Sequence, residues 1–204
     1  MQDYKLYACT RDKAWQILID CKISSLPVRV SQICRHYGWR LTSYTDGERA
    51  IDALGLSDLK SHTDGFCISL GDKYYIFYDD TTPRSRQRFT VAHEIGHIVL
   101  GHIGNGEYTH INREPSAADA PEEIQANQFA ARLLAPAWVL HSVHALTAED
   151  IVKVCDISMA AAQFRAERIA ELEQRNAYLS HPLERQIAEQ FQSYIRRVLV
   201  GGWE

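Results

Sequence analysis

Residues 88–102, RFTVAHEIGHIVLGH, place three histidines and one glutamate in an otherwise apolar stretch. His93 and His97 are four positions apart, so on an α-helix they lie about 40° apart around the axis and one turn apart along it. Two imidazoles at this spacing can bind one zinc ion through ring nitrogens at about 2.0–2.1 Å. Glu94 borders the same face and can reach a water on the metal without binding the metal itself. The stretch therefore predicts a helix that carries a metal site.

Each part of this HExxH pattern has a role in hydrolysis. Zinc lowers the pKa of a bound water towards neutrality and polarises a carbonyl group. A carboxylate such as Glu94 can accept the proton of that water and later pass it to a leaving amine. Two buried histidines with satisfied hydrogen bonds would show the same spacing. The surroundings favour the metal, because Gly96 leaves room for close packing and apolar residues supply a buried side: Val91, Ile95, Ile98 and Val99.

A metal site of this type needs a third protein ligand, and residues 122–136, EEIQANQFAARLLAP, offer one. Glu123 and Asn127 share one face of the helix expected there, with the apolar stripe on another face. We expect Glu123 to bind the metal and Asn127 to hold His93 by a hydrogen bond. Glu122 is expected only to interact favourably with the dipole of the helix N-terminus.

His102 is a rival third ligand. It follows His97 by five residues, which is about 140° around a helix, so it faces away from the site unless the helix has ended. The longer pattern HExxHxxGxxH would need glycine at position 100 and histidine at position 103, where the chain has Leu100 and Ile103. His102 is therefore not predicted to bind the metal.

The elements that must position these residues predict an α+β fold that is mostly helical. Residues 65–79 alternate apolar side chains around a Gly71–Asp72 turn, which predicts an antiparallel hairpin packed beside the HExxH helix. Pro83 opens that helix, and a second long helix runs from near Pro121 to Pro136. The strand at 73–78 directly precedes the HExxH helix. We expect it to be an exposed edge where extended substrate could pair.

The sequence predicts that the chain has two parts. Residues 1–145 would form one domain with N-terminal helices, the small sheet and both long helices. Residues 146–204 would be a C-terminal helical extension packed on that domain, ending in a helix at 182–199 whose apolar residues recur every four positions. Within it, residues 147–169 superficially suggest two helices around a short turn at 156–158.

Composition excludes several classes of protein. The chain has 204 residues, 46% of them hydrophobic, a net charge of -4 and a pI of about 6.1. Residues 147–204 carry seven Lys/Arg and nine Asp/Glu, so direct nucleic-acid binding is not expected. The N-terminus lacks the apolar run of a signal peptide, and no segment reaches the length of a transmembrane helix. Five scattered cysteines suggest reduced thiols, so we expect a cytoplasmic protein.

The pair of motifs, RQRFTVAHEIGHIVLGH and EEIQANQFAARLLAP, resembles the ImmA/IrrE family of zinc metallopeptidases. The resemblance implies a zincin-like catalytic core with a gluzincin-like site: His93, His97 and Glu123 as zinc ligands and Glu94 as the catalytic base. It also implies a substrate, a helix-turn-helix transcriptional repressor, whose cleavage would derepress stress-response or mobile-element genes. The alternative is a zinc-stapled, non-catalytic module that binds and sequesters a repressor or antitoxin partner.

Two functional roles stay open at this point. The group that stabilises the oxyanion has four candidates: Tyr108, His110, His141 and His144. Three arginines, Arg84, Arg86 and Arg88, could form a docking surface for an acidic partner segment or could be a solvated helix start.

Overall fold

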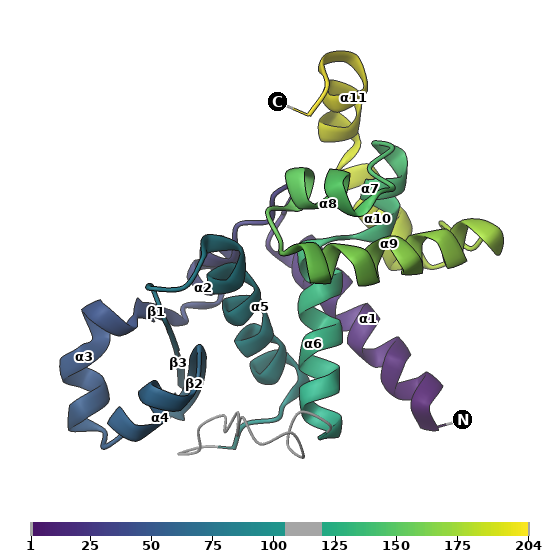
Figure 1. Ribbon diagram of the computed structural model, residues 1–204. Coiled ribbons are helices and arrows are strands. Elements are labelled where there is room, and N and C mark those ends of the chain that lie inside the picture. Colours follow the sequence, from purple (N-terminus) through teal and green to yellow (C-terminus); the bar gives the residue numbers. More distant parts are fainter. Residues whose placement is uncertain (1, 105–119, 204) are drawn as a thin grey trace. The chain divides into compact units, whose positions relative to one another are not determined.

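The computed structural model describes residues 2–104 and 120–203 and shows the predicted α+β, mostly helical fold (Figure 1). The chain forms two compact units, one with residues 1–10 and 30–130 and the other with residues 11–29 and 131–204. Along the chain, one boundary between the units falls within a helix, at 130–131. The division into domains at 145–146 stays a prediction. Helices α1 (Gln2–Asp20) and α6 (Pro121–Leu134) each contribute to both units.

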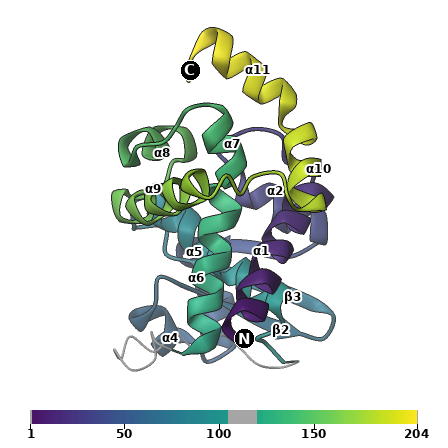
Figure 2. The same cartoon turned by 90° about the vertical axis from the view of Figure 1, so that its right-hand side faces the viewer.

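The first unit is built around three short strands. Its elements, in chain order, are α2 (Val30–Tyr37), β1 (Arg40–Ser43), α3 (Tyr44–Ala53), α4 (Ser57–His62), β2 (Gly65–Leu70), β3 (Lys73–Tyr78), α5 (Arg84–Leu100) and most of α6. The helix α5 carries the HExxH residues. In both ribbon views it lies beside α6 (Figures 1 and 2).

The sheet is mixed rather than antiparallel. The hairpin of β2 and β3 forms as predicted, and β1 pairs parallel to β3, with Leu41 opposite Ile76. The strand order is β1-β3-β2, so β3 lies in the centre. The prediction that Lys73–Tyr78 is an exposed edge is therefore wrong. A parallel partner needs a crossover connection, here α3, α4 and β2, and the spacing of apolar residues within a strand does not reveal such a partner.

The two faces of the hairpin pack against different helices. Phe66 and Phe77 are paired across the strands with ring centroids 5.1 Å apart, and they join the core formed with α3 and α4. Cys67 and Ile76 form the next pair and point to the other face, where the Cys67 thiol donates to the carbonyl of Glu94 at 3.6 Å. Alternation along the strands thus places the sheet directly behind the HExxH helix.

The second unit is helical. It contains α7 (Ala137–Ser142), α8 (Ala148–Cys155), α9 (Met159–Gln174), α10 (Pro182–Gln190) and α11 (Gln192–Gly201). The two helices predicted around a turn at 156–158 are α8 and α9, with Asp156 in the left-handed conformation at φ 53°. The single helix predicted at 182–199 is two helices, and Phe191, whose side chain is fully buried, lies at the break between α10 and α11.

The N-terminal segment of this unit is tied to its C-terminal part. The side-chain amide of Gln190 donates to the carbonyls of Leu18 and Ile23 at 2.8 and 2.6 Å. Arg165, which is buried, donates to the carbonyl of Ala135 at 2.5 Å. Among the residues that the structure describes, no helix is long and apolar enough to cross a membrane.

Candidate metal centre

Helix α5 places its functional residues in the interior. His93, Glu94 and His97 are 5%, 0% and 3% exposed. The helix is held closely on both sides: a Cβ atom at Gly65 of β2 would collide with the methyl group of Thr90. Burying a polar side chain without a hydrogen-bond partner is costly, so each of these three residues is expected to have polar neighbours. Those neighbours determine the protonation and the orientation of each side chain.

Helix α6 approaches the same helix at Gly96. A Cβ atom there would lie 3.1 Å from the Phe129 ring and 3.3 Å from the backbone of Ala126. The room that the sequence predicts behind the site is thus taken up by α6. This close approach brings Glu123, one turn earlier on α6, against the two histidines.

His93, His97 and Glu123 form a triangle of ligand atoms. The two Nε2 atoms are 3.0 Å apart, and each is 3.2 Å from an oxygen of Glu123. Ligands about 2.0–2.1 Å from a tetrahedral zinc ion lie about 3.3 Å from one another, so these edges fit one face of such a site. Within the described residues, these three are the group of His, Cys, Asp and Glu side chains that can hold a metal ion.

The electrostatics of the cluster keep Glu123 in the form that binds metals. Burial by itself raises the pKa of the Glu123 carboxyl, but its hydrogen bonds with His93 and His97 outweigh this and lower the pKa to about 2. Burial likewise lowers the pKa of His93, and the hydrogen bond with Glu123 and the charges of Glu94 and Glu123 reverse the shift and raise it. A cation between these groups would take the place of the shared proton.

Asn127 holds His93, as the i, i+4 spacing from Glu123 predicts. Its side-chain oxygen lies 3.0 Å from Nδ1 of His93. An amide oxygen only accepts, so His93 carries a proton on Nδ1, and a metal ion that displaces the proton shared with Glu123 would meet the lone pair of Nε2.

His102 lies closer to the site than a continuous helix would allow. Helix α5 ends at Leu100, and Gly101 has a left-handed φ of 77°. The amide of His102 donates to the carbonyl of His97 at 2.9 Å and that of Gly101 donates to Ile98 at 3.2 Å. This Schellman turn folds the chain back. It brings Nδ1 of His102 to 3.2 Å from Nδ1 of His97. Sequence reasoning missed this contact, although glycine directly before the histidine was a signal for it.

The candidates for oxyanion stabilisation stay predictions. Tyr108 and His110 lie outside the described residues. His141 and His144 belong to the second compact unit, where Nδ1 of His141 is 2.9 Å from a carboxylate oxygen of Glu173.

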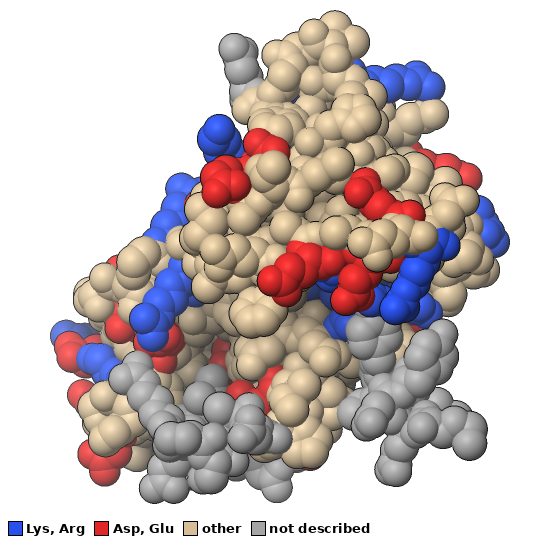
Figure 3. Space-filling model, turned by 45° about the vertical axis from the view of Figure 1, so that its right-hand side comes forward, with Lys and Arg blue, Asp and Glu red and all other residues tan. Residues whose placement is uncertain are grey.

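The three arginines at the start of α5 do not form one exposed surface. Arg88 is 8% exposed, and Arg86 forms an ion pair with Asp64 at 2.5 Å. On the face drawn in Figure 3, the basic side chains of the described residues are interspersed with acidic and uncharged ones. The arrangement agrees better with a solvated helix start than with a docking surface for an acidic segment.

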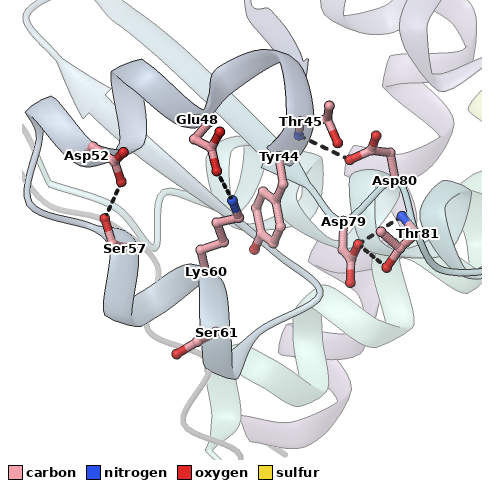
Figure 4. A pocket seen from close by; sticks show the side chains of 10 residues that line it. All are labelled: Tyr44, Thr45, Glu48, Asp52, Ser57, Lys60, Ser61, Asp79, Asp80 and Thr81. Carbon is pink, nitrogen blue, oxygen red and sulfur yellow. Dashed lines mark hydrogen bonds and ion pairs between the residues drawn. The ribbon is translucent and has the colours of Figure 1, made fainter.

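A polar recess of about 500 Å³ lies elsewhere in the first unit, between α3, α4 and the end of β3 (Figure 4). Its carboxylates are held locally. Glu48 pairs with Lys60 at 3.2 Å, Asp79 accepts from Thr81, and Asp80 accepts from the backbone amide of Thr45. These bonds account for the acidic side chains as caps and surface ion pairs.

Comparison with known protein families includes a match to this chain. The sequence model of a peptidase family, described as the IrrE N-terminal-like domain, matches residues 48–192, which include both motifs of the metal centre. A search of curated proteins found no match.

Proposed function

We propose that this chain, which belongs to the IrrE N-terminal-like family of peptidases, is a zinc-dependent endopeptidase. One observation carries the choice of metal. Two imidazole Nε2 atoms and one carboxylate meet with edges of 3.0–3.2 Å, and the two rings are held on their Nδ1 sides. Neutral nitrogen and carboxylate donors with an open fourth position are typical of catalytic rather than structural zinc.

The protein side of the reaction follows from the positions of the side chains. A zinc ion at His93, His97 and Glu123 would supply Lewis acidity and an acidified water. Glu94 lies one residue from His93 on the same helix and is completely buried. Its carboxylate accepts the proton of the attacking water and then delivers it to the nitrogen of the leaving amine. Asn127 keeps His93 in the tautomer whose Nε2 can act as a ligand.

We further propose that the substrate is a helix-turn-helix transcriptional repressor, cut in an exposed segment so that stress-response or mobile-element genes are derepressed. The support is the resemblance of the two motifs to the ImmA/IrrE peptidases. Selectivity would come from contacts away from the metal, since remote binding energy orients the right partner and raises kcat for it.

The test combines the purified zinc-loaded protein with a repressor encoded beside it and with casein. We expect a single cut in the repressor and none in casein, both detected by mass spectrometry of the products. Glu94→Gln should keep the zinc and lose about 10²–10⁴-fold in cleavage rate, because an amide cannot accept the proton of the water. Near-normal cleavage by Glu94→Gln would assign the base to another group. Tight repressor binding without cleavage at any zinc concentration would favour the sequestering module.

A further inference from the structure

We propose that His102 is a positioning residue of the metal centre, acting through His97. The inference rests on the zinc site of the proposed function and adds a residue to it. The geometry is a hydrogen bond between two imidazoles: Nδ1 of His102 and Nδ1 of His97 are 3.2 Å apart, with ring centroids 5.1 Å apart at 74°. His97 thus has a partner on its Nδ1 side, as His93 has in Asn127.

The direction of this bond follows from the role of His97. For Nε2 of His97 to offer a lone pair to a metal, its proton must sit on Nδ1 and be donated to His102. His102 must then accept at Nδ1 and carry its own proton on Nε2. Gln125 of α6 is a side-chain hydrogen-bond partner of His102. The amide nitrogen of Gln125 donates to the carbonyl of Pro121 at 3.0 Å, and its oxygen can accept from Nε2 of His102.

The resulting chain of hydrogen bonds joins the two helices that carry the ligands. It runs from His97 on α5 through His102, just beyond the end of α5, to Gln125 in the second turn of α6. Glu123 lies two residues before Gln125. His102 therefore fixes the ring of one ligand and also ties the end of α5 to the turn that supplies another. Partners of this kind typically contribute 10–100-fold to metal affinity.

The local backbone is built for this contact. Gly101 adopts φ 77°, a conformation that residues with a Cβ atom rarely take. Nothing lies within 4 Å of a Cβ atom added at Gly101, so close packing does not account for glycine there. The conformation itself does, because it turns the chain back so that position 102 faces His97 rather than solvent.

The experiment measures zinc affinity by competition with a chromophoric chelator, which needs no peptidase activity. His102→Leu should weaken zinc binding about 10–100-fold. His102→Asn should restore most of the affinity, because its amide oxygen can accept from Nδ1 of His97 as Asn127 does from His93. His36→Leu, at an exposed histidine of α2, is the matched control and should leave the affinity unchanged.

Thermal unfolding of the metal-free proteins separates this role from a general loss of fold. If His102→Leu unfolds, Gln125→Leu replaces it, with a smaller loss of affinity expected. The visible spectrum of the cobalt-loaded protein should change in His102→Leu and return towards wild type in His102→Asn. Unchanged affinity in a folded His102→Leu, or no rescue by asparagine, would overturn the inference. A wild-type protein that cuts no substrate, but whose zinc affinity depends on His102 as described, would contradict the proposed function and leave this inference standing.

Discussion

The ligand side chains contact one another, and each of the two histidines also has a partner at its Nδ1 atom. His93 and His97 each lie 3.2 Å from Glu123, and the two imidazoles are buried while Glu123 is only partly exposed. The depressed pKa of Glu123, at about 2, means that its carboxylate is ionised at any physiological pH. The site is thus prepared to receive a cation rather than assembled by one.

We expect His97→Ala to abolish stoichiometric zinc binding. It removes one nitrogen ligand and leaves His93 and Glu123, and two protein ligands are fewer than catalytic zinc sites use. Metal analysis of the purified protein should give one zinc per wild-type chain and less than a tenth of that in the variant. His36→Ala should bind one zinc as the wild type does. One full equivalent of zinc in His97→Ala would show that the metal is bound elsewhere.

The sequence was informative about these residues where they lie on helices, and uninformative where a helix ends. Spacing of four residues places His93 with His97 and Glu123 with Asn127, because helix geometry alone decides which side chains share a face. The position of His102 depends on a left-handed residue at Gly101, after which the periodicity no longer applies. A glycine predicts that such a turn is allowed, but not which atom the next side chain will contact.

At the scale of elements, the site depends on how closely α6 approaches α5. The contact passes over Gly96, where an added Cβ atom would meet the Phe129 ring at 3.1 Å and the backbone of Ala126 at 3.3 Å. A backbone cannot move aside as the end of a flexible side chain can. A Cβ atom here would need its neighbours on α6 to give way by a few tenths of an ångström, and a larger side chain would displace α6, and Glu123 with it, further.

We therefore expect Gly96→Val to weaken zinc binding while the protein still folds. Overpacking of this kind typically costs about 1–3 kcal/mol of stability. The ligand triangle should also open, so zinc affinity is expected to fall by at least about tenfold. Chelator competition measures the affinity and urea unfolding measures the stability. Gly201→Val is a suitable control, because that helical glycine has open space around it. Wild-type zinc affinity in Gly96→Val would show that α6 can shift without disturbing Glu123.

The sheet shows a limit of the sequence at this scale. The hairpin was predictable, since strand periodicity and the Gly71–Asp72 turn are local signals. The parallel pairing of β1 with β3 joins Arg40 to Tyr75 across 35 positions, and nothing local specifies it. The consequence matters for function. Substrate backbone cannot pair with the central strand β3, so strand addition to this sheet would have to use β1 or β2.

At the scale of the whole molecule, a segment near the N-terminus belongs to the same compact unit as the C-terminal part of the chain. Residues 11–29 belong to the same compact unit as residues 131–204, and Gln190 bonds to the carbonyls of Leu18 and Ile23. A division by sequence order could not predict this, because composition and periodicity report only on neighbouring residues. Three of the four tryptophans, Trp15, Trp138 and Trp203, lie in this unit, so their fluorescence follows its unfolding.

A buried carboxylate in this unit allows its stability to be tested against pH. Glu184 of α10 is 5% exposed and accepts from the backbone amide of Leu179 at 2.6 Å. Burial raises the pKa of Glu184 above its usual 4.5, although the Leu179 amide and the charges of Arg11 on α1 and Arg165 on α9 oppose the shift. The ionised form is therefore less favourable in the folded than in the unfolded protein.

The sign of the pH effect follows from this raised pKa. Below the usual pKa of 4.5 the Glu184 carboxyl is protonated in both the folded and the unfolded protein, so it does not lower the free energy of unfolding. As pH rises through the folded pKa, the carboxyl must ionise while buried, and the free energy of unfolding falls. Glu184→Gln keeps an oxygen for Leu179 but has no charge. We expect its stability relative to wild type to be greatest at pH 7 and to decline as pH falls towards 4. Urea unfolding, followed by tryptophan fluorescence, measures the free energy of unfolding of each protein. In the difference between the variant and the wild type, the effects of groups that titrate in both proteins cancel. Glu189→Gln, at an exposed position of the same helix, should show no such trend. A Glu184→Gln difference that stays constant with pH, or that grows as pH falls, would mean that Glu184 is better stabilised as an anion than its burial implies.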